Sequence, residues 1–285
     1  MLGRITVGLF FLLLVWGNLV AGMKAGLACP DWPLCQGRVL PPFRLDIWME
    51  FTHRVIAAVA TVSLLLLAAR RLKSYRGMAR TVPLAAVAIL ATEIVIGGMV
   101  VLLELPANLT TLHFVTGTTV FLLAAYMARF EESGRTPAFS ARGVAGLMLT
   151  LVLLVASQAA LGAYVRHAGA GLACPDFPTC GGSWLPPLVS SGVAIQLSHR
   201  LFACLILATL ALFWVATRLD ARLATHRREA LALLVLGAAQ VALGGVVVLS
   251  GLSYVATACH LAVALLLMLL IGRIWAAEVA GKGIR

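Results

Sequence analysis

The sequence has few charged residues: Asp, Glu, Lys and Arg together make up 12% of its 285 residues. A soluble domain has about 25% charged residues, so roughly half of the polar surface that such a domain needs is missing. The net charge of +11 could suggest a nucleic acid partner, but that interpretation needs a basic face on a soluble domain, and 61% of this chain is hydrophobic. The composition therefore predicts an integral membrane protein with no nucleic acid partner.

Eight apolar runs are long enough to cross a bilayer, which takes roughly 20 residues in a helix. The links between them are short and leave no room for an extramembrane catalytic domain. Residues 1–25 also resemble a signal peptide, but the repeat described below favours a retained first helix. The expected spans are at about 5–23, 47–69, 82–103, 109–128, 143–165, 191–217, 230–250 and 254–275.

Positive residues are concentrated at the two termini and in the links after the second, fourth and sixth spans. By the positive-inside rule, this distribution predicts a multi-pass protein of the cell inner (plasma) membrane with both termini cytoplasmic. The two longest links, which follow the first and fifth spans and each contain two cysteines, are then external. The net charge is then a topology signal. The residues are Arg4, Arg70, Arg71, Lys73, Arg76, Arg80, Arg129, Arg135, Arg142, Arg218, Arg222, Arg227, Arg228, Arg273, Lys282 and Arg285.

The chain contains an internal repeat. The segment AGLACPD occurs at residues 25–31 and again at 170–176, and later matches are His53-Arg54 with His199-Arg200 and Gly97-Gly98 with Gly244-Gly245. The glycine pairs predict close approach of a neighbouring helix or a flat ligand. Four helices per copy keep both copies in one orientation. We predict an all-α integral membrane protein with eight transmembrane helices in two pseudo-symmetric four-helix bundles, residues 1–130 and 143–285, joined by a cytoplasmic linker at 131–142.

Four histidines lie inside predicted spans, two in each repeat: His53, His113, His199 and His260. Ionisable residues inside the membrane are costly and usually mark function. A single buried histidine is most simply explained by a hydrogen bond to a neighbouring helix. One pair in each bundle instead indicates axial ligation of a haem iron, whereas a zinc or copper site would need more ligands.

The repeats differ beside these histidines. The first has Glu50 three residues before His53, and the second has Gln196 three residues before His199. Residues at this spacing share one face of a helix. The difference suggests a reaction site in the first repeat only, although Glu50 could also simply orient a loop or pair with Arg54. Glu93, which corresponds to Gln240, is a second difference that suggests either proton supply or a neutral hydrogen-bonded acid.

Each large external loop contains two cysteines, Cys29 and Cys35 in the first and Cys174 and Cys180 in the second. In an oxidising compartment such pairs are expected to form disulfides. The competing interpretation, a metal site, lacks the Cys-x-x-Cys spacing and histidine partners of zinc sites. Cys204 and Cys259 fall inside predicted helices, where we expect them to be packing residues.

Together, the eight helices in two repeats, Glu-x-x-His-Arg in the second span, single histidines in the fourth, sixth and eighth spans and a Cys-x5-Cys pair in each loop resemble bacterial heme A synthase. The resemblance covers nearly the whole chain. One departure is Glu93, where the family pattern has glutamine.

The resemblance implies an oxidoreductase that oxidises the C8 methyl group of heme O to a formyl group, giving heme A for cytochrome oxidase. It assigns substrate heme O to His53 and His113, cofactor heme b to His199 and His260, and the oxidation to Glu50. Heme O synthase, cytochrome oxidase assembly factors and membrane lipid are the implied partners, and a homo-oligomer is left open. The alternatives are a non-enzymatic dihaem cytochrome b for quinol-linked electron transfer and a haem carrier.

Overall fold

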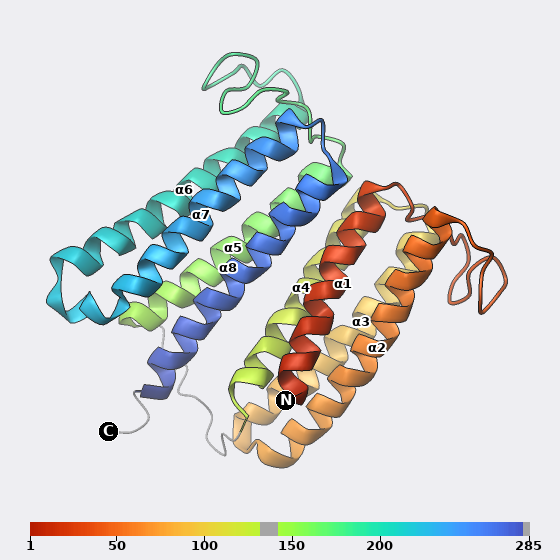
Figure 1. Cartoon of the computed structure of the whole chain (residues 1–285), viewed down its shortest axis with the longest axis horizontal. Coiled ribbons are helices and arrows are strands. Elements are labelled where there is room, and N and C mark those ends of the chain that lie inside the picture. Colours follow the sequence, from red (N-terminus) through yellow and green to blue (C-terminus); the bar gives the residue numbers. More distant parts are fainter. Residues whose placement is uncertain (132–141, 282–285) are drawn as a thin grey trace. The chain divides into compact units, whose positions relative to one another are not determined.

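The computed structural model describes residues 1–131 and 142–281, and most of these residues are helical (Figure 1). Most of the expected linker at 131–142 lies outside the described residues, as do Arg135, Lys282 and Arg285. The chain divides into two compact units, Met1–Ser140 with Ala276–Arg285, and Ala141–Trp275. All eight predicted helices are present and are long and apolar enough to span a membrane.

The first four long helices are α1 (Leu2–Gly22), α2 (Leu45–Ser74), α3 (Thr81–Leu102) and α4 (Ala107–Arg129). A short 3-10 helix, η1 (Gly77–Arg80), links α2 to α3. In this bundle α1 packs against both α2 and α4. A methyl group on Gly3 would be 2.7 Å from the backbone of Ala128, so a residue without a side chain lets α1 and α4 approach.

The other four long helices are α5 (Gly143–His167), α6 (Ser191–Leu219), α7 (Arg227–Leu249) and α8 (Tyr254–Gly281). The link from α6 to α7 is again a 3-10 helix, η2 (Ala221–His226). Ser190 caps α6 through its hydroxyl, which accepts a hydrogen bond from the amide of Val193 at 3.2 Å. Neither 3-10 helix was expected from hydrophobicity, which does not report the hydrogen-bond pattern of a charged link.

Two helices extend five or six residues beyond the predicted spans, α2 to Ser74 and α8 to Gly281. In α2 the extension carries Arg71, whose guanidinium is buried against the end of α4. It donates to the carbonyl oxygens of Met127 at 2.9 Å and Glu131 at 3.0 Å. A cation there satisfies carbonyls that a helix end leaves without intrahelical partners.

The prediction that Cys204 and Cys259 are packing residues is wrong, because both side chains are exposed on the helix surface. Large apolar side chains are exposed on the same helices, including Leu212 at 70% and Val255 at 54%. In a membrane, apolar residues face lipid as readily as the core. Hydrophobicity along the sequence therefore cannot distinguish a buried position from a lipid-facing one.

Candidate functional site

Each of the four helix-borne histidines lies with its ring against a glycine of the preceding helix. A methyl group on that glycine would approach the histidine Cε1 atom to between 2.9 and 3.3 Å. At 2.9 Å the ring or the helix would have to move, whereas at 3.0–3.3 Å a shift of a few tenths of an ångström would suffice. The four pairs are Gly17 with His53 at 2.9 Å, Gly97 with His113 at 3.0 Å, Gly162 with His199 at 2.9 Å, and Gly244 with His260 at 3.3 Å.

The two histidines of each bundle also lie near each other. His53 and His113 are close enough to interact electrostatically, as are His199 and His260. The Nδ1 atoms of His53, His199 and His260 are buried without a hydrogen-bond partner among the described residues. Two imidazoles per bundle, each against a glycine and each with a buried Nδ1 atom, form a donor set that fits a haem.

Glu50 is buried near the first histidine pair, 6% exposed, and is close enough to His113 to interact electrostatically. Its Oε1 atom lies 3.1 Å from Nε of Arg54, one turn further along α2. The pairing of Glu50 with Arg54, which the sequence left as an alternative to a reaction role, is therefore present. A buried carboxylate and a guanidinium at this distance stabilise each other while leaving one carboxylate oxygen free of this contact.

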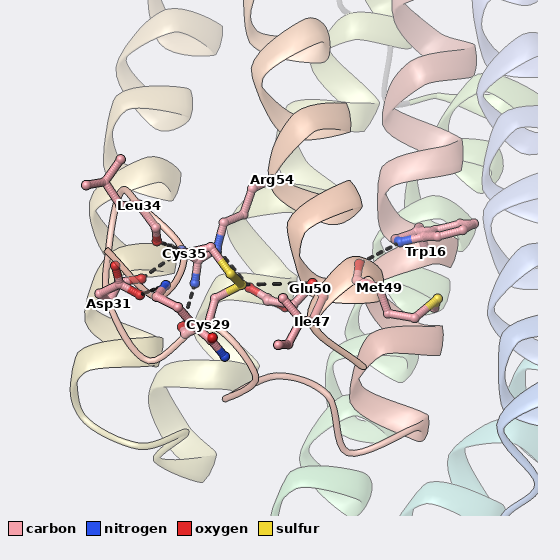
Figure 2. A network of polar contacts seen from close by, with 10 residues as sticks. Trp16, Cys29, Asp31, Leu34, Cys35, Ile47, Met49, Glu50 and Arg54 are labelled. Atoms are coloured by element: carbon pink, nitrogen blue, oxygen red, sulfur yellow. Dashed lines mark hydrogen bonds and ion pairs between the residues drawn. A yellow bond between two sulfur atoms is a disulfide. The ribbon is translucent and has the colours of Figure 1, made fainter. Parts of the chain in front are cut away.

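Arg54 connects this carboxylate to the cysteine loop, as Figure 2 shows. The same guanidinium donates hydrogen bonds to the carbonyl oxygens of Asp31 at 2.7 Å and Cys29 at 2.8 Å, and also to that of Leu34. Arginine offers five donors in one rigid plane, so it can hold a loop and a carboxylate together. Sequence reasoning missed this loop contact because it joins residues 20 or more positions apart.

The second bundle repeats the loop contact without the carboxylate. Arg200 donates to the carbonyl oxygen of Cys174 at 2.9 Å and lies 5.8 Å from the centre of the Phe177 ring. In place of Glu50, the amide of Gln196 donates to the carbonyl oxygen of Gly171 at 3.4 Å. An amide can hydrogen-bond but cannot take up a proton at neutral pH, so the two bundles differ in what they can do chemically.

The second glycine of each pair on α3 and α7 has a different neighbour from the first. A methyl group on Gly98 would meet the Trp32 ring at 3.0 Å, and one on Gly245 would meet the Phe177 ring at 2.7 Å. The glycine pairs thus receive a histidine ring on one residue and a loop aromatic on the next. The close approach predicted at the glycine pairs is therefore made by side chains, a histidine ring from the neighbouring helix and an aromatic ring from a cysteine loop.

Both cysteine loops fold around an aspartate. Asp31 accepts the backbone N–H groups of Gln36 and Gly37, and Asp176 accepts those of Gly181 and Gly182. The Gly37 amide, together with that of Gln36, lowers the pKa of Asp31 below its ordinary value, and the Thr179 hydroxyl does most to lower that of Asp176. The turn brings the Sγ atoms of Cys29 and Cys35 to 1.97 Å and those of Cys174 and Cys180 to 1.96 Å.

Further polar residues beside the histidines continue the contrast between carboxylates and amides. Glu93 lies against His113 in the first bundle, whereas Gln240 Nε2 lies 3.3 Å from His260 Nε2 in the second. Gln158 donates to the carbonyl oxygen of His199 at 2.8 Å, and its counterpart at the repeat offset of 145 is Leu13. Sequence reasoning missed Gln158, although comparing the first helices of the two repeats would have revealed it.

The fold and the site define a membrane protein made of a duplicated four-helix unit, with one pair of glycine-seated histidines in each unit. A family described as cytochrome oxidase assembly protein matches residues 2–271. The heme A synthase of Symbiobacterium thermophilum is 33% identical over 267 residues, which cover 87% of this chain and 85% of that protein. Those of Shouchella clausii and Halalkalibacterium halodurans are 28% and 30% identical, and the matches cover 76% and 71% of this chain and 75% and 71% of theirs. The chain therefore belongs to the heme A synthase family, as the sequence motifs predicted.

Proposed function

We propose that this protein is a heme A synthase, which oxidises the C8 methyl group of heme O to a formyl group and so makes heme A for cytochrome oxidase. The observation that carries the proposal is the difference between two otherwise equivalent histidine sites. Each has two glycine-seated imidazoles, but the first adds the carboxylates Glu50 and Glu93 and the second has the amides Gln196 and Gln240. Two sites with the same electron-transfer role would not need this difference.

The first four-helix repeat, residues 1–130, takes substrate heme O between His53 and His113. The second four-helix repeat, residues 143–285, holds heme b between His199 and His260. When bound, the haem groups supply the redox chemistry, and the protein contributes orientation and electrostatics. The amides around His199 and His260 suit a cofactor that stays in place, because they stabilise a polar site without exchanging protons.

Glu50 is the catalytic residue. Its buried carboxylate accepts a proton from the substrate site, orients water there or stabilises positive charge at the carbon being oxidised, and each role needs a carboxylate close to the reacting group. Arg54 holds that carboxylate in place at 3.1 Å. Because Arg54 also binds the carbonyl oxygens of the first cysteine loop, the loop and Glu50 keep a fixed relation over the substrate.

The protein lies in the plasma membrane with both termini cytoplasmic and the cysteine loops external, an orientation supported by the distribution of Lys and Arg. Heme O synthase, cytochrome oxidase assembly factors and membrane lipid are its partners, in a monomer or a homo-oligomer.

In the oxidising external space, Cys29–Cys35 and Cys174–Cys180 form disulfides. We expect a membrane-impermeant thiol reagent to label none of these cysteines in intact cells unless a reductant is added first. Mutating one cysteine of a pair to serine should leave the other cysteine free to react with the reagent. Such variants serve as the positive controls. Free labelling of all four without reductant would show that the bridges are absent.

The function is tested by the pigments of the protein coexpressed with a heme O synthase. We expect extraction and mass analysis to find heme b, heme O and newly formed heme A. Two permanent b-type haems and no heme A would instead identify a dihaem cytochrome b. Readily exchanged haem with no oxidised product would identify a haem carrier. Either result, obtained with redox partners present, would contradict the proposal.

A further inference from the structure

Glu93 on α3 is a second carboxyl group at the first histidine pair, and its side chain is only 15% exposed. Its Oε1 atom lies 3.1 Å from Nδ1 of His113, at the distance of a hydrogen bond but without its direction. The Thr116 hydroxyl donates a hydrogen bond to the other carboxyl oxygen, Oε2. Both carboxyl oxygens of Glu93 thus face groups on α4 that can act as hydrogen-bond donors.

The chain also provides space for this carboxyl group. A methyl group on Gly117 would come to 2.7 Å from Glu93 Oε1, closer than real contacts allow, so the position of the carboxyl group requires glycine there. At the repeat offset of 147, Thr116 and Gly117 correspond to Val263 and Ala264. The second bundle therefore lacks both the hydroxyl donor and the space, and it has an amide, Gln240, instead of the acid.

We propose that Glu93 is a positioning residue for heme O, an inference that rests on the proposed function. It accepts the Nδ1–H of His113 and so directs the Nε2 atom of that ring toward the substrate iron. The ring completes this hydrogen bond by turning when Nε2 binds. Carboxylates commonly orient metal-binding histidines in this way and increase their basicity. Gly97 on the same helix, α3, supports the face of the ring at Cε1, so α3 fixes both the place and the rotation of His113.

A more basic histidine stabilises ferric iron over ferrous iron. Glu93→Gln should therefore weaken heme O binding in the first unit by roughly tenfold or more. It should also raise the midpoint potential of that haem by about 59 mV for an approximately tenfold shift in the one-electron equilibrium. Heme b in the second unit should keep its potential. The measurements are redox titration and heme O titration of the full-length protein in detergent.

Gly117→Ala provides a second variant that keeps the Glu93 carboxyl group but displaces it. Like Glu93→Gln, it should weaken heme O binding and raise the midpoint potential of that haem. Ala264→Gly is the matched control in the second unit, where no carboxyl group is displaced, and the potentials of both haems should be unchanged. If both first-unit variants bind heme O with wild-type affinity and potential, Glu93 does not position His113. Loss of heme b together with heme O would also overturn the proposal, because it would indicate a general packing role.

These outcomes separate the inference from the proposed function. Wild-type protein that makes heme A, while the Glu93 and Gly117 variants keep wild-type haem properties, refutes the positioning role alone. If the wild-type protein makes no heme A, but both variants change the potential of the haem in the first unit, the proposed enzymatic function is refuted and the positioning role is supported.

Discussion

Glu50→Gln is expected to stop the formation of heme A while both units keep their haem. The substitution preserves the size of the side chain and an oxygen that can accept from Nε of Arg54, now 3.1 Å from Oε1. Arg54 also keeps its hydrogen bonds to the carbonyl oxygens of Asp31 and Cys29, so the loop stays in place. Only the negative charge and the capacity to take up a proton are lost. Because groups of this kind contribute roughly 100-fold or more to a rate, we expect at least that loss of heme A formation.

The measurement is the ratio of heme A to heme O in pigment extracted from variant and wild-type protein. Glu104→Gln is the matched control, because it makes the same chemical change at an exposed carboxyl group in the link between α3 and α4. Its heme A yield should equal that of the wild type. A Glu50→Gln protein that still made heme A at the wild-type rate would leave Glu50 only the role of pairing with Arg54.

Substitution of the glycines beneath the histidines of the second unit should reduce heme b occupancy in a graded way. A methyl group at position 162 would be 2.9 Å from Cε1 of His199, and one at position 244 would be 3.3 Å from Cε1 of His260. Gly162→Ala must therefore displace the His199 ring, whereas Gly244→Ala needs only a small shift of the His260 ring. Overpacking costs about 1–3 kcal/mol, which corresponds to a roughly 5- to 140-fold weaker affinity when it falls on the bound state.

Gly272→Ala on α8 is the control, because a methyl group there meets nothing within 4 Å. The expected order of heme b per protein is wild type equal to Gly272→Ala, then Gly244→Ala, then Gly162→Ala, measured by absorbance against protein concentration. The reverse order, or full occupancy in Gly162→Ala, would show that these glycines serve helix packing rather than the placement of the histidine rings.

Much of the fold follows from local composition. A span needs only a long apolar run, so the eight helices are recognisable from the sequence, and apart from the C-terminal ends of α2 and α8 their ends are accurate to a few residues. The extension of α2 past the predicted end was not recognisable, because Arg71 was counted as a charge in a loop. It is instead buried against carbonyl oxygens of Met127 and Glu131, and a contact between residues so far apart leaves no local pattern.

The candidate site was partly predictable for a different reason. The duplication places two copies of one arrangement in a single sequence, so comparing the copies selects the histidine pairs and the exchange of Glu50 for Gln196 without any structure. It does not give distances. The hydrogen bonds from Arg54 to the cysteine loop depend on how α2 meets residues 29–34, and the contact of Glu93 with Thr116 and His113 depends on how α3 meets α4.

The sequence by itself thus determined the class of protein, the helices, the repeat and the types of residue at the site, because hydrophobicity, spacing and duplication are properties of a linear chain. Only the tertiary structure decided which glycine supports each histidine ring, that the adjacent glycines receive Trp32 and Phe177, and that Cys204 and Cys259 are exposed rather than packed. Those outcomes depend on the rotation of each helix about its axis, which an almost uniformly apolar membrane helix does not encode in its hydrophobic pattern.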